Sequence, residues 1–492
     1  MEPRYDPRAW KALIPDIDRI IGRLEEAHTL SIGITPYTRI IPALFLRNYS
    51  IYVTKRSSDA NVMERSVRLH VLEDRYPKVA DKVHSTGYLL NSFAFQNFLK
   101  SWRGPLTLMV NTLTARTIEA LERTGARWIG NAPETYQTVA NKAPFRELVR
   151  SLGLPSLDSV SLDRSAFLAS TFGAMHDAHQ GAFVVQRGDK EVGGNEGTFF
   201  IRDQEAFDRC VRALATDESF ESVLVTPFID GYSCSMLGCV TEQGTLTGPL
   251  QLQLIDVPEA LHGVEPSGIF LGNDLGFRPW SAAIEQSAQE VVEGIGAHLF
   301  AHGYRGIFGI DFLYDSARDR IYPNECNPRF TGSLVLYSLS LLEAGIPPLE
   351  FFHLIAQLGI KADFDFDAVN AKLKSRLAYS HVALSPKGIP AMSVPLMAGI
   401  YEFDPAGPAL AYVGPGITLS DIQNERQFLL IDTVPSVGTV LEQEVPRLFK
   451  FIFPRSIALS SYEVDEQAGY LLERFAKTLI RASPAETTPE RD

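Results

Sequence analysis

The stretch from Gly303 to Phe330, "GYRGIFGIDFLYDSARDRIYPNECNPRF", constrains the fold of this chain more than any other. It holds two apolar runs, and acid or amide side chains interrupt each of them: Asp311 in the first, Glu325 and Asn327 in the second. Burying a lone carboxylate without a partner is energetically expensive. The stretch therefore predicts two buried strands whose polar side chains face a common partner.

Strand periodicity brings these side chains together. Residues i and i+2 of a strand share a face, so Glu325 and Asn327 point the same way, while Cys326 points to the other side. Asp311 would lie on the neighbouring strand, because the two runs are joined by the short turn-forming segment "SARD". Three oxygen ligands suit Mg²⁺, which fills its remaining positions with water and phosphate. The residues alone leave open a second interpretation, in which the acids form a structural salt bridge with Arg305, Arg318 or Arg320.

Composition narrows the class of protein. The 492 residues are enough for about two or three domains. The 45% hydrophobic content is typical of a globular core, and the net charge of −13 argues against a nucleic-acid partner. No run approaches the ~20 apolar residues of a membrane span, the N-terminus lacks the pattern of a signal peptide, and the four cysteines form no CxxC pair. We expect a cytoplasmic protein.

The N-terminal part alternates strand and helix. The run "LTLMVN" (106–111) is apolar, residues 114–125 are helical with a Thr114 cap and a Gly125 stop, and "ARWIGN" (126–131) is apolar again. This order predicts a parallel, Rossmann-like sheet. No GxGxxG motif follows the first strand, so a dinucleotide site is not supported.

The middle of the chain predicts a flap over a phosphate site. Residues 181–201 read as strand, glycine-rich polar loop and strand, 222–240 as strand, turn and strand, and 281–302 as a helix. Backbone N–H groups in a loop such as "GGNEG" can wrap phosphate oxygens. The flap and the acidic strands together indicate a nucleotide held between them. Beyond residue 350 we expect short strands with Pro- and Gly-rich turns, a helix over 466–480 and a disordered tail.

Over roughly 131–345 the chain resembles the ATP-grasp superfamily of carboxylate–amine ligases. The parts occur in the same order: a lysine in "ANK", a "GLP" link, the glycine-rich flap, a hinge strand before "IDG", then "GIDF" and "NECNPRFTGS". The most specific match is "E-x-N-P-R", in which Glu325 follows Asp311 by fourteen residues. The ending "PRFTGS" and the C-terminal segments "MSVPLMAGIYEF" and "PSVGTVLE" resemble the pheganomycin-type peptide ligases.

This resemblance implies an α/β (α+β) fold, namely an ATP-grasp fold with a Rossmann-like pre-ATP-grasp domain and a small mixed C-terminal domain. The domain bounds that we expect are 1–130 for the pre-ATP-grasp domain, 131–350 for the ATP-grasp domain with its flap lobe at about 155–230, 351–482 for the C-terminal domain and 483–492 for the tail.

The resemblance also implies the roles of individual residues. The metal ligands would be Asp311, Glu325 and Asn327, and Arg329 would lie near the transferring phosphoryl or acyl group. Arg305 could serve the substrate or simply pair with an acid. The residues expected to contact ATP are Lys142, Gln186, Gly193, Gly194, Thr226, Phe228 and Ile229. Side chains that select the substrate would lie in 260–280, where His262 and Asn273 are candidates, in the loop after Thr331-Gly332-Ser333 and in the C-terminal domain.

Three positions depart from the family pattern. Gln186 stands where a lysine is usual, so Lys190 or Arg187 would have to supply the charge. Thr226 stands where a hinge glutamate is common, which puts the ribose contacts in doubt. Gly309 replaces an arginine of the D-alanine ligase branch, which argues against D-alanine–D-alanine ligation.

The resulting hypothesis is an enzyme that activates a carboxylate as an acyl phosphate with ATP and joins it to an amine, here an amino acid or short peptide in specialised metabolism. The cofactors would be ATP and Mg²⁺, with Mn²⁺ as a substitute. Its partners would be the small-molecule carboxylate and amine, with no nucleic acid and no membrane, and a homodimer is one option for its oligomeric state. The alternatives are a carboxylase-like enzyme and a non-catalytic ATP-binding regulatory or scaffold protein.

Overall fold

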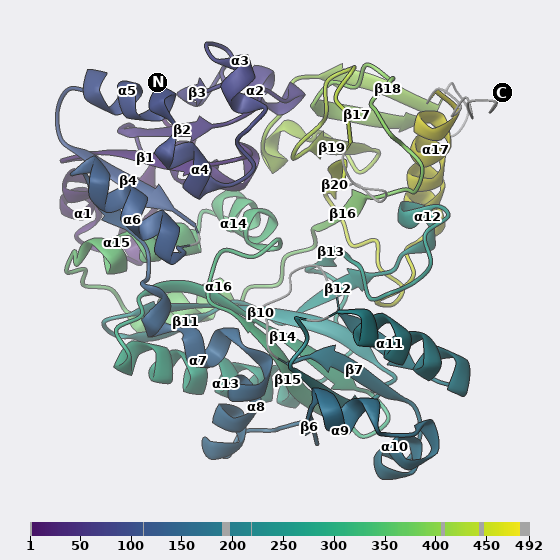
Figure 1. Cartoon of the computed structure of the whole chain (residues 1–492). Helices are drawn as coiled ribbons and strands as arrows, with labels where there is room; N and C mark the ends of the chain where they lie inside the picture. The colour runs from purple at the N-terminus through teal and green to yellow at the C-terminus, as the bar shows by residue number, and fades with distance from the viewer. Residues whose placement is uncertain are drawn as a thin grey trace.

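The computed structural model describes residues 2–111, 113–188, 197–217, 219–404, 409–441 and 447–482. The predicted mixed α/β architecture is confirmed (Figure 1). In Figure 1 the N-terminal sheet and the C-terminal strands lie side by side at the top, above the strands from the middle of the chain. The small flap lobe lies at the lower right. The expected tail, 483–492, lies outside the described residues. No helix in the described ranges is long and apolar enough to cross a membrane.

The N-terminal sheet is parallel, as its strand–helix–strand order predicts. Its strand order is β3-β2-β1-β4-β5, and all its pairings are parallel. Helix α6 begins after Thr114, whose side chain accepts a hydrogen bond from the Thr117 N–H, and ends at Gly125 with φ of 66°. The strands are β1 His28–Gly33, β2 Tyr49–Val53, β3 Leu69–Val71, β4 Leu106–Val110 and β5 Arg127–Ile129. The helices are α1 Ile17–Leu24, α2 Ser58–Met63, α3 Pro77–Ala80, α4 Thr86–Asn91, α5 Phe93–Ser101, α6 Ala115–Thr124, α7 Gln137–Ala140 and α8 Lys142–Ser151.

The flap lobe is an antiparallel sheet with strand order β6-β9-β7-β8. Its core is aromatic, with Phe167, Phe183 and Phe207 buried between the sheet and its helices. The strands are β6 Val160–Asp163, β7 Phe183–Arg187, β8 Thr198–Ile201 and β9 Ser222–Pro227, and the helices are α9 Arg164–Leu168, α10 Phe172–His179 and α11 Gln204–Thr216. The predicted strand–loop–strand over 181–201 is thus confirmed for its two strands, while Gly193 and Gly194 lie outside the described residues.

A single large sheet links the middle of the chain to the C-terminal region. Its order is β15-β14-β10-β12-β13-β16-β20-β19-β17-β18, with β11 beside β10. The sheet crosses the expected boundary at residue 350, because β16 pairs with β13. The strands are β10 Tyr232–Thr241, β11 Gly244–Thr247, β12 Gln251–Ile255, β13 Phe270–Asp274, β14 Gly306–Asp315, β15 Arg320–Asn327, β16 Ser380–Leu384, β17 Gly399–Asp404, β18 Ala409–Gly414, β19 Gln427–Ile431 and β20 Phe449–Phe453.

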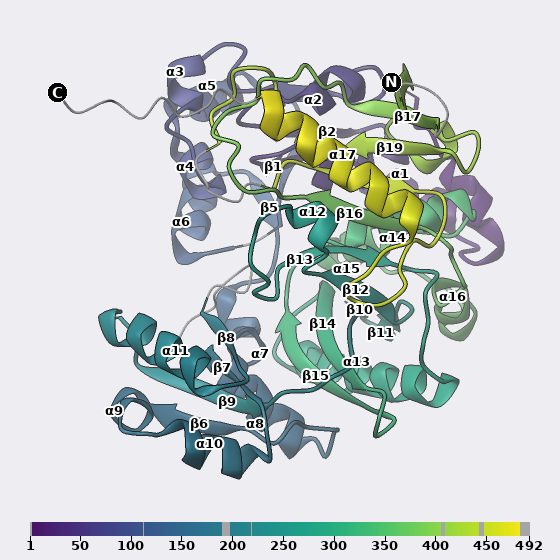
Figure 2. The same ribbon diagram turned by 90° about the vertical axis from the view of Figure 1, so that its right-hand side faces the viewer.

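Helices cover this sheet closely. Helix α13 packs against β10, β11 and β15, and Gly238 makes this approach possible, because a Cβ there would lie 2.8 Å from Val292 Cγ1 and 2.6 Å from Phe308. Helix α17 lies across the C-terminal strands (Figure 2), where Phe475 packs edge-on against Phe451. The helices are α12 Pro258–Leu261, α13 Ala282–Ala301, α14 Leu334–Glu343, α15 Leu349–Leu358, α16 Phe366–Leu373 and α17 Glu466–Ala482.

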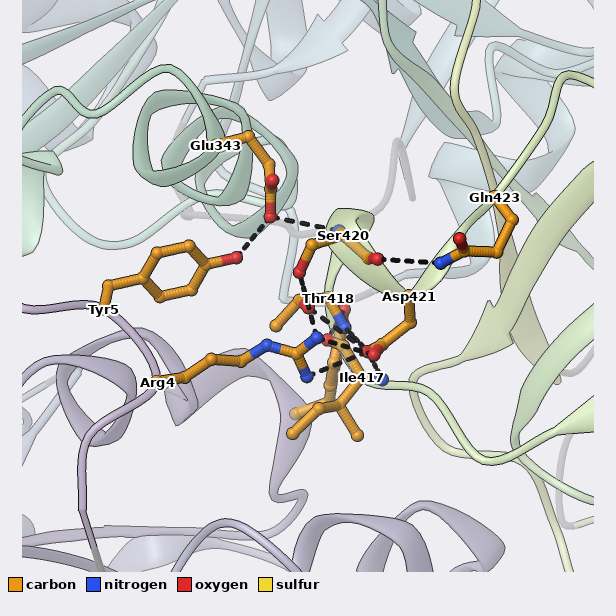
Figure 3. A network of polar contacts seen from close by, with 9 residues as sticks. Arg4, Tyr5, Glu343, Ile417, Thr418, Ser420, Asp421 and Gln423 are labelled. Atoms are coloured by element: carbon orange, nitrogen blue, oxygen red, sulfur yellow. Dashed lines mark hydrogen bonds and ion pairs between the residues drawn. The ribbon is translucent and has the colours of Figure 1, made fainter.

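A polar network ties the N-terminal segment to α14 and the C-terminal region (Figure 3). Arg4 Nη2 lies 2.6 Å from Asp421 Oδ1. The Tyr5 hydroxyl donates to Glu343 at the end of α14, and Glu343 also accepts the Ser420 N–H at 3.0 Å. Burial, and then the bond to Glu343, raise the pKa of Tyr5 to about 12. The network therefore fixes the far end of α14, the helix that follows the Thr331-Gly332-Ser333 loop.

A buried carboxyl group in α15 should give the fold a measurable pH dependence. Burial raises the pKa of Glu350 from 4.5 to about 8, and the Ser338 Oγ–H donates to this carboxyl at 2.5 Å. The folded state therefore binds a proton more tightly than the unfolded state, so the contribution of Glu350 to the free energy of unfolding falls as the pH rises from about 4.5 to about 8. At pH 8, Glu350→Gln should raise the free energy of unfolding by on the order of 3–5 kcal/mol.

Urea denaturation across this pH window would test the prediction. The exposed Glu119→Gln on α6 is the matched control and should leave the pH slope unchanged. An equal slope in wild type and Glu350→Gln would contradict the assignment.

Candidate nucleotide and metal site

A cleft of about 290 Å³ lies between the flap lobe and the large sheet. The structure brings eight of the predicted site residues to its walls: Gln186, Thr226, Phe228, Ile229, Asp311, Glu325, Asn327 and Arg329. The flap strands β7 and β9 supply the first two, and the acidic strands β14 and β15 supply the metal-ligand candidates. The cleft therefore joins the two halves of the site that the sequence predicted separately.

The floor of the cleft is a hydrogen-bonded row on β14 and β15. Asp311 pairs with Glu325 in antiparallel register, so both side chains share a face. Asn327 Nδ2 donates to Asp311 Oδ2 at 2.9 Å, and Gln253 Nε2 donates to Asp311 Oδ1 at 2.9 Å. Arg329 Nη2 donates to Asn327 Oδ1 at 2.9 Å. Hydrogen bonds thus connect Asp311, Asn327 and Arg329, to which β12 adds Gln253, while Glu325 joins this group through its cross-strand pairing with Asp311.

The electrostatics of this row suit a divalent cation. Burial, and then the neighbouring Glu325 charge, raise the pKa of Asp311 to about 7, while Arg329 and the hydrogen bonds from Asn327 and Gln253 act in the opposite direction. Two adjacent carboxylates facing a polar cleft repel each other, and a metal ion relieves that repulsion. The described part of the chain holds no cluster of three or more His, Cys, Asp or Glu side chains that could bind a metal. At this site only two of the three proposed ligands are carboxylates, and the third would be the Asn327 amide.

The alternative salt bridges to arginine do not form at this site. Arg318 pairs with Asp315 at 2.7 Å. Arg305 pairs with Glu242 at 2.6 Å and stacks on the Phe300 ring. Arg305 was a candidate catalytic residue. Its guanidinium lies at the turn between β10 and β11 and does not line the cleft, so its catalytic role stays a prediction.

Two cations that approach Glu325 come from α8. Lys142 is at the start of α8, and its Nζ lies 3.2 Å from Glu325 Oε2. Lys142 does not line the cleft, so its predicted contact with a nucleotide phosphate stays a prediction. Arg146 is buried, donates to Asn324 Oδ1 at 2.7 Å and also to the Pro323 carbonyl. Burial lowers the pKa of Arg146 to about 10. Sequence reasoning missed Arg146, because its partners are distant in sequence and follow a β-bulge in the pairing of β14 with β15.

The flap side of the cleft carries no charged side chain among the described residues that line it. Gln186 is buried and its Nε2 donates to Thr198 Oγ1 at 3.4 Å. Arg187 pairs with Asp217, and Lys190 lies outside the described residues.

The Phe228 N–H donates to the Ala182 carbonyl at 2.9 Å, and the Phe228 ring contacts Phe200 edge-on. Phe228 and Ile229 thus supply an apolar surface suited to a base, while the Phe228 N–H is already used within the flap lobe.

One wall of the cleft holds an unpaired acceptor. Asn273 on β13 is 1% exposed, and its Nδ2 donates to Ser235 Oγ and to the Leu252 carbonyl, each at 3.2 Å. Its Oδ1 has no hydrogen-bond partner among the residues described.

The sequence predicted substrate-selecting side chains in 260–280 and named Asn273 and His262 as candidates. Asn273 lines the cleft, but His262 does not. The sequence did not identify Ser235 or Gln253 as site residues, because each lies in an ordinary strand pattern.

Comparisons with known proteins agree with this geometry. Residues 187–333 match the ATP-grasp domain family. The C-terminal section of the carbamoyl phosphate synthase large chain from Methanopyrus kandleri is 24% identical over 249 residues, which are 50% of this chain and 41% of that protein. The match thus spans about two fifths of the length of that relative.

Two solved structures share the fold across most of the chain. The N5-carboxyaminoimidazole synthase from Aspergillus clavatus, in complex with ADP, is 12% identical, with a TM-score of 0.51 and coverage of 93% of this chain and 99% of that one. The L-amino acid ligase from Bacillus licheniformis is 11% identical, with a TM-score of 0.51 and coverage of 92% and 98%. Residues 187–333 thus match an ATP-grasp domain, and the chain as a whole shares its fold with these two structures.

Proposed function

We propose that this protein uses ATP to activate a carboxylate as an acyl phosphate, which an amine then attacks to form an amide or peptide bond. The observation that carries the proposal is the grouping of Asp311, Glu325, Asn327 and Arg329 on the floor of the interlobe cleft. The carboxylate oxygen would attack the γ-phosphorus, ADP would leave, and the amine would then displace phosphate from the acyl carbon. The amine loses a proton as the amide forms.

Asp311, Glu325 and Asn327 would hold Mg²⁺, and their shared face and hydrogen bonds support this role. When bound, the ion neutralises charge at the β- and γ-phosphate oxygens. Asn327 receives a hydrogen bond from Arg329 and donates one to Asp311, so its amide is fixed in orientation. Arg329 lines the cleft and carries the positive charge that would stabilise the phosphoryl and acyl-phosphate oxygens.

The substrate that we favour is an amino acid or short peptide. The unpaired Asn273 Oδ1 in the cleft would accept a hydrogen bond from an amine or ammonium group. Thr331, Gly332 and Ser333 line the same cleft immediately before α14, where backbone N–H groups favour a carboxylate. A zwitterionic substrate has both groups. The finer resemblance to pheganomycin-type peptide ligases, and with it a role in specialised metabolism, is part of this proposal.

The direct test is amine- and acid-dependent release of ADP and phosphate from ATP. A panel of paired amino acids should include at least one pair that raises ADP release about tenfold or more over ATP alone, with a matching amide product by mass spectrometry. A second set of assays combines bicarbonate with each amine. If ADP release requires bicarbonate and does not require an amino acid as the carboxylate, a carboxylase-like activity replaces the ligase proposal.

Removal of divalent metal should abolish turnover. Because Asp311 and Glu325 repel each other on the floor of the cleft, we expect excess chelator to lower ADP release below detection and added Mg²⁺ to restore it. Mn²⁺ should restore part of the rate. Full turnover in excess chelator would contradict the metal assignment.

A further inference from the structure

A second cavity, of about 380 Å³, lies where α13 begins and shares no wall with the nucleotide cleft. Its polar lining comes from the segment before α13, the first turns of that helix and the segment before β16: Arg278, Trp280, Glu285 and Arg376. Helix α13 is 20 residues long and runs along the large sheet (Figure 1). None of these residues has a role in the ATP-grasp chemistry proposed above.

Two residues that line this cavity each carry a buried donor without an acceptor among the described residues. Trp280 is 8% exposed, its ring packs edge-on against Tyr314, and its Nε1–H has no partner in the described part of the chain. Arg278 Nη2 is also buried and has no partner there, although Arg278 Nε donates to the Leu275 carbonyl at 3.3 Å. A buried donor without an acceptor destabilises the protein, so two in one cavity indicate an acceptor that the chain itself does not supply.

The charges around the cavity favour an anion. Arg278 and Arg376 bring two positive charges and Glu285 brings one negative charge, with Arg278 Nη1 3.6 Å from Glu285 Oε1. Arg376 is exposed and forms no ion pair with any described residue. Burial lowers the pKa of Arg278, and the charge of Arg376 acts in the same direction, against that of Glu285. The positive end of the α13 dipole adds to this field, because Ala282 at its first position also lines the cavity.

From this geometry we infer that the cavity at the start of α13 binds a phosphate group, held by the Trp280 indole N–H, the Arg278 and Arg376 guanidinium groups and the N-terminus of α13. A phosphate offers several strong acceptor oxygens, which matches donors that converge from three separate segments. The ligand is either free phosphate or the phosphate of a phosphorylated metabolite. The site is separate from the proposed ligase reaction and does not depend on it.

The Trp280 indole signal gives a local test on the full-length chain. In protein labelled with ¹⁵N-tryptophan, the indole resonance that disappears in Trp280→Phe identifies Trp280. On titration with inorganic phosphate at constant ionic strength, this resonance should shift and saturate, whereas chloride should not shift it. Arg376→Gln should weaken phosphate binding about tenfold, because it removes one charge-assisted contact. The control Arg212→Gln, an exposed arginine on α11, should bind like wild type.

Each result has a defined meaning. A saturable shift that Arg376→Gln weakens supports the site, and the same titration with glycerol 3-phosphate separates the two ligand sources. Tighter binding of the ester assigns a phosphorylated metabolite, and tighter binding of phosphate assigns the free ion. If the Trp280 resonance does not move with either probe, or moves equally in wild type and Arg376→Gln, the inference is overturned. Arg376 is exposed, so its variant should fold normally, and its unchanged thermal transition would verify this.

Discussion

Asp311→Asn should lower the rate of ADP formation by about 10²-fold or more, with little change in the stability of the fold. Asp311 is at the centre of the cleft floor, where it accepts hydrogen bonds from Asn327 and Gln253 and lies opposite Glu325. An asparagine keeps the size of the side chain and removes the charge that would hold the metal. Loss of one charge-stabilising group of this kind typically reduces kcat by about 10²–10³-fold. Steady-state ADP release at saturating ATP is the measurement.

The matched control for this variant lies on the same strand. Asp315→Asn changes another buried aspartate of β14, which accepts from the Ala317 and Arg318 N–H groups at the turn into β15 and does not line the cleft. It should leave kcat within about threefold of wild type and affect mainly the stability of the β14–β15 hairpin. If Asp311→Asn keeps a rate similar to that of Asp315→Asn, the cleft floor is not the reaction centre.

Local patterns in the sequence predicted the elements that build the site. The neighbouring strands β14 and β15 were predicted from two apolar runs and a turn, and the structure confirms both strands and adds the Asp311–Glu325 register. Period-two alternation placed Asn327 on the same face as Glu325, and there Asn327 donates to Asp311. Alternation could not reveal the bulge after Asp311, which brings Asn324 to the cleft as well. A bulge arises from the pairing of two strands, and one strand alone carries no signal for it.

Contacts between distant segments were the part that the sequence could not supply. Arg305 was expected either to serve the substrate or to pair with an acid, and no sequence pattern identified Glu242, at the turn between β10 and β11, as that acid. Lys142 was predicted to contact ATP, and no sequence pattern showed that it lies beside Glu325. The continuous sheet shows the same limit, since apolar alternation predicts that β16 is a strand but not that β13 is its neighbour. Each of these contacts depends on the folded topology.

One buried carboxylate, that of Asp274, reinforces the link between β13 and the C-terminal region that the pairing of β13 with β16 forms. Asp274 is 0% exposed and follows Asn273, whose amide lines the cleft. Its Oδ1 accepts the Gly276 and Phe277 N–H groups at 2.8 and 2.9 Å. Its Oδ2 accepts the Ser456 Oγ–H at 2.9 Å and the N–H groups of residues 457 and 458 at 2.8 and 2.9 Å. One side chain thus satisfies donors from two segments that are far apart in the sequence.

Asp274→Ala should therefore lower the free energy of unfolding by about 3–5 kcal/mol, because it leaves several buried donors without an acceptor. Urea denaturation measures this loss. Ser456→Ala is the matched control, since it removes one donor and leaves the carboxylate in place, and it should cost about 1 kcal/mol or less. ADP release should fall in Asp274→Ala even below its unfolding transition, because the β13 backbone that positions Asn273 loses its anchor to the residues after β20. A loss in Asp274→Ala no larger than that in Ser456→Ala would show that water satisfies these donors and that the carboxylate does not hold the two regions together.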